Sequence, residues 1–521
     1  MSSKTLTIAG HWVRKSLVAG VIMGLGMTMA STSTFAHDDE ECFEIFPFNR
    51  VATMPVVRGI GGVDYTATYE KARAASVYLA NYVATNVEAT LLGEELIQGI
   101  DWKLGGTSED CLLSPELCTE HEIDEAVLAI PSTEPIDPTD PAYVEDGTVT
   151  PENTKKGNVL DFCNKKYASL AMGVDPIVGS EEDGDALYVV NGFSHAPALP
   201  CEVSIWNDDK HIYVDMLSPS AIFTLFFTDV VFGENMQDED FAAAMNAMPA
   251  QVKAEIQAII IAALTEFDPE TVAMNQQIGP VFKSLEEIDA VVDASPYDSP
   301  YLHMSYTRSD GGTFTEEESK AVAQAIINTL TTHEDEDIGV HTTVINEDGD
   351  TLDSILSENS SWRSARLEPI SIPGKNHIIE ACSPYYAKMA MSTGLHHVNA
   401  LPCEITVKII DDGNKLVVSY LDPAFMMSAL FADITDEEKE QLADIPSAII
   451  ADLQNIVWAA LTITSEIPMN APTQISFDML APEGFFDVEV EDEVVDEVVD
   501  EVVDEVVDDG GNGGQGGNGG H

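Results

Sequence analysis

The sequence is poor in basic residues, and it has no long apolar run after its N-terminal segment. Lysine and arginine together number 24 against 90 aspartates and glutamates, which gives a formal net charge of −66. A field of this sign repels nucleic acid and anionic lipid, so neither is expected as a partner. The longest later apolar stretch, residues 221–232, is too short to cross a bilayer, and we expect it to be buried.

Signatures of well-known catalytic sites are missing as well. The sequence has no Gly-x-Ser-x-Gly, no His-Glu-x-x-His, no phosphate loop and no dinucleotide fingerprint. It also has no Cys-x-x-Cys pair, which excludes a zinc ribbon and a haem-attachment motif. The sequence therefore identifies no catalytic residue and fixes no cofactor, and it leaves open whether the protein is an enzyme.

Residues 1–36 have the features of a secretory signal peptide. A basic stretch precedes the apolar residues 17–30, and Thr34 and Ala36 suit the −3 and −1 positions of a cleavage site. The apolar stretch is short for a bilayer span, which needs about 20 residues. We therefore expect a periplasmic or secreted protein with no membrane span after cleavage, in a compartment where disulfides can form.

Two parts of the chain resemble each other. Residues 198–205 (Ala-Leu-Pro-Cys-Glu-Val-Ser-Ile) align with residues 400–407 (Ala-Leu-Pro-Cys-Glu-Ile-Thr-Val), and residues 249–265 align without a gap on residues 446–462. Upstream, a cysteine followed by x-x-x-Tyr-Ala-x-x-Ala-Met occurs once in each part. Because these matches follow one another in the same order, the sequence predicts a duplicated domain.

Each copy is predicted to be a small α+β domain. The pattern begins with an amphipathic helix, at about residues 68–91 in the first copy and 315–330 in the second, where Thr315 and Glu318 are expected to form a capping box. A strand that ends at a cysteine, a short helix, a strand that begins at Leu-Pro-Cys, a hairpin and a third strand follow. A closing helix is predicted to start after Pro249 or Pro446.

The chain as a whole is predicted to contain two such domains in tandem between a signal peptide and a disordered tail. Acidic charge and glycine content predict the disorder of the tail, which repeats Glu-Val-Val-Asp. The predicted segments are a signal peptide (1–36), a lead-in (37–55), a first copy (56–290, core 157–265), a second copy (291–480, core 374–462) and the tail (481–521).

The core of each copy resembles the domain of unknown function 302 family. In the second copy the resemblance rests on residues 374–382 (Gly-Lys-Asn-His-Ile-Ile-Glu-Ala-Cys), 400–407 and 420–423 (Tyr-Leu-Asp-Pro), and the first copy has corresponding residues at 159–163 and 198–205. The resemblance implies a small α+β fold and a tendency to dimerise, so a homodimer is a possible assembly. It implies no established activity and supplies no catalytic residues.

Each copy carries the same set of one histidine and two cysteines. In both copies the histidine stands six residues before the Leu-Pro-Cys cysteine, although the loop before it is much longer in the first copy. We therefore expect the end of this loop to be constrained in both copies. The set consists of Cys163, His195 and Cys201 in the first copy and Cys382, His397 and Cys403 in the second.

The chemistry of this set has several interpretations. Disulfides Cys163–Cys201 and Cys382–Cys403 would each contribute roughly 3–4 kcal/mol, if their Cα atoms lie within about 7 Å. Alternatively, the two cysteines and the histidine of each copy bind a soft metal ion or haem iron. Thiol redox chemistry is a third interpretation, because the first cysteine precedes a predicted helix, where a thiol pKa falls. Inert buried thiols are the fourth.

Three of the seven cysteines lie outside this set. Cys111 and Cys118 are expected to form a disulfide with each other, which leaves Cys42 as the odd cysteine. The function expected from the sequence is that of a non-enzymatic binding or interaction module outside the cytoplasm, braced by cysteine pairs, with a protein or small molecule as ligand. The alternative is a thiol redox protein, or a metal- or haem-handling protein that uses the repeated set.

Overall fold

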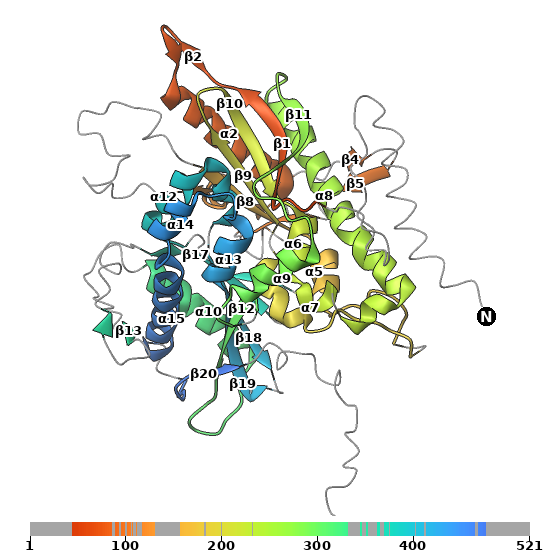
Figure 1. Cartoon of the computed structure of the whole chain (residues 1–521), viewed down its shortest axis with the longest axis vertical. Coiled ribbons are helices and arrows are strands. Elements are labelled where there is room, and N and C mark those ends of the chain that lie inside the picture. Colours follow the sequence, from red (N-terminus) through yellow and green to blue (C-terminus); the bar gives the residue numbers. More distant parts are fainter. Residues whose placement is uncertain are drawn as a thin grey trace, which may run out of the picture. The chain divides into compact units, whose positions relative to one another are not determined.

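The structure, a computed structural model, describes most of the chain between residues 44 and 475 (Figure 1). The predicted signal peptide at 1–36, Cys42 and the predicted tail at 481–521 lie outside the described residues. Within the described part, the following residues are also left out: 86–88, 93–94, 99–101, 106, 108–110, 112–116, 131–156, 182–183, 200, 232, 298, 332–343, 346–350, 353–361, 365–368, 373, 375, 402, 411–412 and 464–466.

The fold is α+β, as predicted, and contains two seven-stranded antiparallel sheets. The first has the order β11-β1-β10-β9-β8-β6, and β7 also pairs with β8. Its strands are β1 (Phe48–Pro55), β6 (Lys103–Leu104), β7 (Leu128–Ile130), β8 (Gly157–Cys163), β9 (Cys201–Asn207), β10 (His211–Leu217) and β11 (Val272–Ile278).

The second sheet has the order β15-β17-β18-β19-β12-β20, and β16 also pairs with β17. Read from its other end, this order matches the first sheet strand for strand. Its strands are β12 (Tyr301–Tyr306), β15 (Arg363–Ser364), β16 (Ile370–Ile372), β17 (Asn376–Cys382), β18 (Cys403–Ile410), β19 (Lys415–Leu421) and β20 (Thr473–Ile475). We call the described residues 44–293 the first half and 301–475 the second half.

The helices follow the same plan in both halves. The first half contains α2 (Tyr65–Thr85), α4 (Glu120–Glu125), α5 (Lys165–Ala171), η3 (Gly192–Ala198), α6 (Pro219–Phe226), α7 (Thr228–Val231), η4 (Glu234–Gln237), α8 (Glu239–Phe267) and α9 (Leu285–Asp293). The second contains α10 (Glu316–Thr331), α12 (Pro384–Thr393), η6 (Leu395–Ala400), α13 (Pro423–Leu430), α14 (Asp436–Gln441) and α15 (Ile445–Ile463). Short two-stranded pairs complete the fold: β2 (Arg58–Gly59) with β3 (Gly62–Val63), β4 (Ala89–Leu92) with β5 (Glu95–Gln98), and β13 (Val344–Ile345) with β14 (Thr351–Leu352).

Several local predictions are confirmed. β8 and β17 end at the first cysteine of each set, and β9 and β18 begin at the second. The helix predicted at 315–330 is α10. Its start is a capping box, because the Thr315 amide donates to Glu318 Oε2 and the Glu318 amide donates to Thr315 Oγ1.

Two other predictions need correction. The closing helix of the first half does not start after Pro249. It starts ten residues earlier, because the Asp238 side chain accepts hydrogen bonds from the amides of Asp240 and Phe241 and caps the helix there. Pro249 therefore lies inside α8. The first helix, predicted to reach residue 91, ends at Thr85.

One described helix, α8, is long and apolar enough to cross a membrane by length and composition alone. Its residues Ile256, Ile259 and Ile260 are fully buried in the core of the first half. α2 and α8 lie against one face of the first sheet, as α10 and α15 do in the second half (Figure 1). This packing agrees with the prediction of a core helix.

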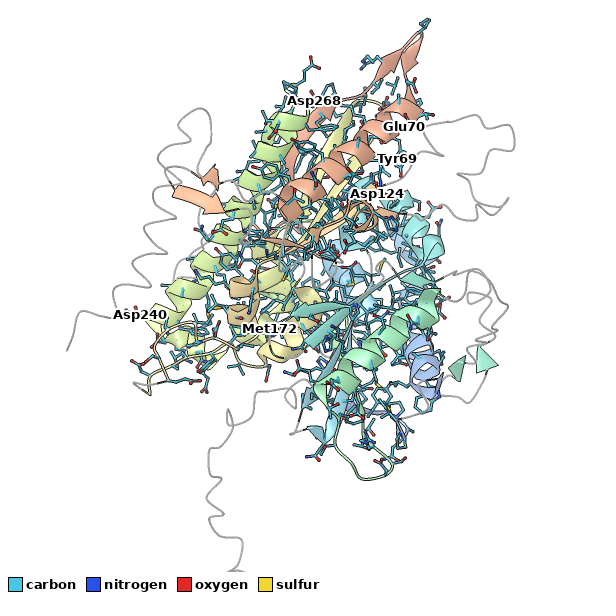
Figure 2. All side chains as sticks on the ribbon, turned by 180° about the vertical axis from the view of Figure 1, so that it is seen from behind. Tyr69, Glu70, Asp124, Met172, Asp240 and Asp268 are labelled. Carbon is cyan, nitrogen blue, oxygen red and sulfur yellow. A yellow bond between two sulfur atoms is a disulfide. The ribbon has the colours of Figure 1, made fainter. Side chains whose placement is uncertain are left out.

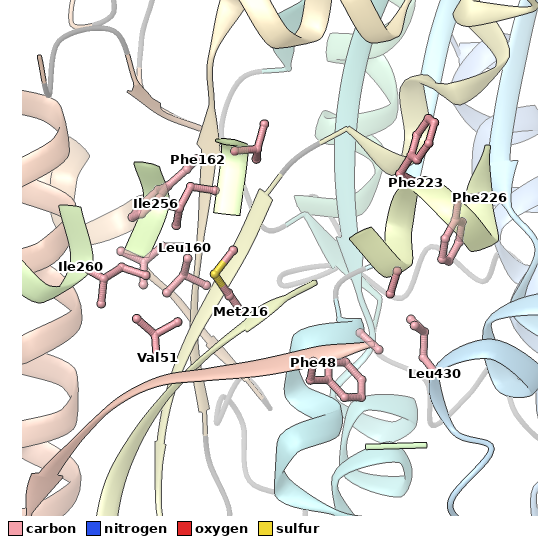
Figure 3. Packing of buried hydrophobic residues seen from close by; sticks show 14 of the residues in the cluster. Phe48, Val51, Leu160, Phe162, Met216, Phe223, Phe226, Ile256, Ile260 and Leu430 are labelled. Carbon is pink, nitrogen blue, oxygen red and sulfur yellow. The ribbon is translucent and has the colours of Figure 1, made fainter. Parts of the chain in front are cut away.

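The opposite faces of the two sheets meet across the 3-10 segments. η6 of the second half lies on β8, β9 and β10, and η3 of the first half lies on β17, β18 and β19. One hydrophobic cluster spans both halves; Figure 3 shows Phe48 and Leu430, which come from different halves, in this cluster. The Phe226 and Phe425 rings meet edge to face, with centroids 5.0 Å apart. Each half therefore covers a sheet face of the other half that would otherwise be exposed to water, and this face carries polar as well as apolar side chains.

At Gly157 the two halves approach each other closely. A Cβ atom at this position would overlap the side chain of Val398, which lies in η6 and is fully buried. Gly157→Ala is expected to lower the free energy of unfolding by about 1–3 kcal/mol, because overpacking pushes η6 away from β8. Urea denaturation monitored by circular dichroism measures this change.

The control is Gly59→Ala, where the added Cβ meets its nearest neighbour, the Asp64 Cβ, at 3.7 Å. This substitution should leave stability within about 0.5 kcal/mol. In the double variant Gly157→Ala/Val398→Ala the cost should be less than the sum of the two single costs. Additive costs would contradict a direct contact between these residues.

Candidate functional site

Each half places its two cysteines where one strand ends and the next begins. Phe162 of β8 pairs with Cys201 of β9, and Cys163 is the next residue. In the second half Ala381 pairs with Cys403 in the same way, and Cys382 is the next residue. The strands are antiparallel neighbours, which is the arrangement that the disulfide interpretation requires.

The structure nevertheless contains thiols and no disulfide at these four positions. In the strand register, Cys163 stands one residue beyond the position opposite Cys201, and the same offset separates Cys382 from Cys403. By contrast, the predicted Cys111–Cys118 disulfide is present and confirmed.

Each cysteine pair lines a pocket, and the two pockets have matching walls. The volume is about 90 Å³ in the first half and about 60 Å³ in the second, and the walls are almost entirely apolar. The matching lining residues are Trp102 and Trp362, Cys163 and Cys382, Tyr167 and Tyr386, Cys201 and Cys403, Pro219 and Pro423, and Phe227 and Phe431.

A buried carboxylate fixes one wall of each pocket. In the first half the Trp102 indole N–H donates to Glu255 Oε2 at 3.0 Å, and the Tyr167 hydroxyl donates to Glu255 Oε1 at 2.7 Å. In the second half Trp362 and Tyr386 donate to the same oxygen of Asp452, at 2.9 and 3.1 Å. These bonds hold the aromatic rings in place, so that each pocket is preformed.

This aromatic wall was not predicted, although its signal is present in the sequence. The gap-free alignment of residues 249–265 with 446–462 places Glu255 on Asp452. Both helices are otherwise rich in apolar residues, so an acidic residue at the same position of each helix indicates a buried polar partner.

Three of the four pocket thiols, those of Cys163, Cys201 and Cys403, are poor nucleophiles. Burial raises the pKa of Cys163 to about 12, and the negative charge of Asp161 adds to this effect. Burial also raises the pKa of Cys201 and of Cys403 far above the ordinary value, with smaller contributions from the neighbouring cysteine and from nearby carboxylates. Because the thiolate is the reactive form, these environments do not favour thiol redox chemistry.

The predicted histidine ligands do not join the cysteines. Among the described residues, the one group of three or more histidines, cysteines and carboxylates close enough to share an ion is His396, His397 and Asp433. The ligand sets predicted from the spacing, with two cysteines and His195 or His397, are therefore not assembled. The 3-10 segments turn both rings toward carboxylates instead.

These carboxylates form a second feature that both halves share. His195 Nε2 lies 2.8 Å from Asp229 Oδ1, and His397 Nε2 lies 3.1 Å from Asp433 Oδ1. The His195 ring packs on Phe227 with centroids 4.1 Å apart, as His397 packs on Phe431 at 4.3 Å. Each aromatic ring also lines the pocket of its half, so the histidine pair and the pocket share a wall.

In the pair of His397 and Asp433, both side chains have a pKa that differs from the ordinary value. Burial lowers the pKa of His397, and Asp433 opposes this effect in part. Burial acts to raise the pKa of Asp433, but the hydrogen bonds with His396 and His397 outweigh it and keep that pKa well below its usual range.

The two methionines of the repeated pattern serve packing. Met172, labelled in Figure 2, is fully buried and packs with Ile370, Ile372 and Ile378 of the second half. Met391 packs with Val159 and Trp206 of the first half in the same reciprocal manner.

Four carboxylates are buried on the strands that face the other half. Asp161 pairs with Glu202 across β8 and β9, and Glu380 pairs with Glu404 across β17 and β18. Each is at most 5% exposed. Burial, followed by the charge of Asp161, raises the pKa of Glu404 well above its ordinary value.

The comparison with protein families finds a match within the second half. Residues 367–456 match the family described as domain of unknown function DUF302. The match runs from β16 into α15 and includes Cys382, His397 and Cys403. A search of curated proteins and a search of solved structures found no match.

The raised thiol pKa values predict slow alkylation. In a Cys42→Ser background, the thiols of the folded protein should react with iodoacetamide at pH 8 on the order of 1,000-fold more slowly than those of the unfolded protein, because few are ionised. Mass spectrometry counts the modified cysteines over time.

An added Ser220→Cys provides the control, because this position is exposed and should be alkylated rapidly. Four thiols should react after denaturation in the parent variant. Rapid labelling of Cys163 in the folded protein would contradict the burial argument, and protection that persists in denaturant until a reductant is added would show disulfides.

The raised pKa of Glu404 predicts a pH dependence of stability. The folded state holds this proton more tightly than the unfolded chain, so the free energy of unfolding should fall as pH rises above about 4.5 toward the folded pKa. The slope is at most about 1.4 kcal/mol per pH unit. Glu404→Gln should flatten this dependence and raise stability at pH 7.

Urea titrations at pH 4.5 to 8 measure the effect. Glu440→Gln is the control, because Glu440 is exposed. This substitution should change neither the stability at pH 7 nor its pH dependence. A variant at position 404 that is as pH-dependent as the wild type would contradict the assignment.

Proposed function

We propose that the protein is an exported, non-enzymatic binding protein with two copies of the DUF302 domain, each of which takes a small apolar molecule into the pocket beside its two cysteines. The matched second half supports one copy directly. The identical strand order of the two sheets and the matching positions of the cysteines support a second copy in the first half.

The similarity of the two pockets is the observation that carries this proposal. The halves differ in helix lengths, insertions and most side chains, yet the pockets keep tryptophan, tyrosine, two cysteines, proline and phenylalanine in equivalent places. A core needs apolar side chains of suitable volume and tolerates many exchanges among them. Retention of the same residue types around a vacant volume points to a ligand.

The chemistry of the walls defines the class of ligand. They expose aromatic rings, aliphatic side chains, thioethers and un-ionised thiols, and the buried acids are occupied by hydrogen bonds with the tryptophan and tyrosine. Nothing in such walls stabilises a charged ligand. With volumes of about 60 and 90 Å³, the pockets are smaller than the enclosed cavity of about 150 Å³ that binds benzene, so a single aromatic ring fits with part of it extending through the open side of the pocket.

The thiol environment favours binding over redox catalysis. A redox cysteine requires a lowered pKa and access to a partner thiol, whereas burial raises the pKa of Cys163 to about 12. Export is supported by the signal-like N-terminus and by the Cys111–Cys118 disulfide, a bond that suits an oxidising compartment.

Toluene binding tests the proposal. Calorimetric titration of the full chain with toluene should give two molecules per chain, and toluene should raise the melting temperature. Ala168→Leu and Ala387→Leu each fill one pocket, at residues that line the first and the second, respectively. Each variant should bind one molecule, and the double variant should bind none.

Ala74→Leu is the matched control, because Ala74 lies on the exposed face of α2. This variant should bind two molecules, like the wild type. Circular dichroism spectra establish that each variant is folded. Absence of binding to the wild type, or undiminished binding to the folded double variant, would exclude the pockets as the ligand sites.

A further inference from the structure

The group His396, His397 and Asp433 lies outside both pockets and has the geometry of a metal site. His396 Nε2 and His397 Nε2 each lie 3.1 Å from a different oxygen of Asp433. One ligand atom from each residue falls within 4.8 Å of the others. Ligands bound to zinc at about 2.0–2.1 Å lie about 3 Å from one another, so these atoms need little movement to share an ion.

The surrounding residues hold the two rings in this arrangement. The His397 ring packs on Phe431, and the edge of Phe48 from the first half meets His396 at a centroid distance of 5.6 Å. The two imidazole rings lie 4.2 Å apart. The histidines are adjacent on η6, and Asp433 follows α13, so two fixed elements of the second half supply all three ligands.

Hydrogen bonds also set the tautomer of His397. The Thr393 hydroxyl donates its proton to the carbonyl oxygen of Ala390 at 2.7 Å. Thr393 Oγ1 must then accept from Nδ1–H of His397, which lies 2.8 Å away. In the neutral ring, Nε2 consequently presents a lone pair to Asp433 Oδ1, which is itself an acceptor.

Two acceptors at this distance need either a proton or a metal ion between them. Histidine ligands of metal ions commonly donate the other ring N–H to an oxygen, which orients the metal-binding nitrogen. Thr393 occupies that second position for His397. The ligand-facing side of the group remains accessible, because His396 is 23% and Asp433 29% exposed, so water can complete the coordination.

We propose that His396, His397 and Asp433 bind one divalent transition-metal ion, such as zinc, with water in the remaining positions. Two imidazoles and one carboxylate are borderline ligands that suit zinc and its neighbours better than calcium or magnesium. The strong negative charge of the protein raises the local concentration of cations and assists entry.

The first half lacks an equivalent third ligand. The residue before its histidine is Ser194, where the second half has His396, so His195 and Asp229 provide two ligand atoms. The proposal therefore predicts one ion per chain, and it holds independently of whether the pockets bind a ligand.

Zinc titration of the metal-free full chain tests the site. Calorimetry at pH 7 in excess Ca²⁺, which occupies surface carboxylates, should show one zinc ion per chain. His396→Ser, which introduces the residue of the first half, and Asp433→Asn should each weaken binding by about 100-fold or more, because each removes a ligand. The same variants should lose the visible absorption bands of the Co²⁺-substituted protein.

His211→Ser is the matched control, because His211 is an exposed histidine on β10. It should retain wild-type affinity and stoichiometry. Circular dichroism shows whether His396→Ser and Asp433→Asn remain folded, and the agreement of two different ligand variants guards against an indirect effect. Absence of zinc binding, or binding that is equal in wild type and both folded ligand variants, would overturn the proposal.

Discussion

The structure depends on the reciprocal packing of its two halves through η3 and η6. Each 3-10 segment packs against helices of its own half and also lies on the sheet of the other half. This exchange determines which residues are buried, because the face of each sheet that carries the paired carboxylates is covered by the opposite half. It also explains why Met172 and Met391 each pack with residues from the other half. Neither half would bury this face alone.

Some features of the site occur in both halves, and others occur in one half alone. Both retain the aromatic pair tied to a helix carboxylate, the two thiols, and a histidine that meets an aspartate and a phenylalanine. They differ beside that histidine, where Ser194 is fully buried and His396 is partly exposed. The histidine–aspartate pair therefore belongs to the architecture of the fold, whereas the third metal-ligand candidate is a property of the second half.

The sequence could predict what short-range interactions determine. The strand ends at Cys163 and Cys382 and the capping box at Thr315 follow from patterns within a few residues, and the α+β class follows from their order. β1 was not predicted, because its partners lie far away in the chain; Phe48, for example, pairs with Leu217. The predicted ligand sets of cysteine and histidine are not brought together among the described residues, and the reason is also long-range. Equal spacing fixed where the histidine stands, but only the distant Asp229 and Asp433 decide where its ring points.

Each pocket lowers the stability of the folded protein, and this cost is an argument that the pockets have a function. An enclosed apolar cavity costs about 24 cal/mol per Å³, so a partly open pocket of about 90 Å³ costs at most on the order of 2 kcal/mol. One or two larger side chains on the surrounding helices would recover that free energy. Both halves instead keep the cavity and, with two hydrogen bonds to a buried acid, hold its aromatic wall open. Imperfect packing does not readily explain why both halves carry this stability cost at equivalent positions. A ligand that fills the pocket and binds only the folded state would offset the cost.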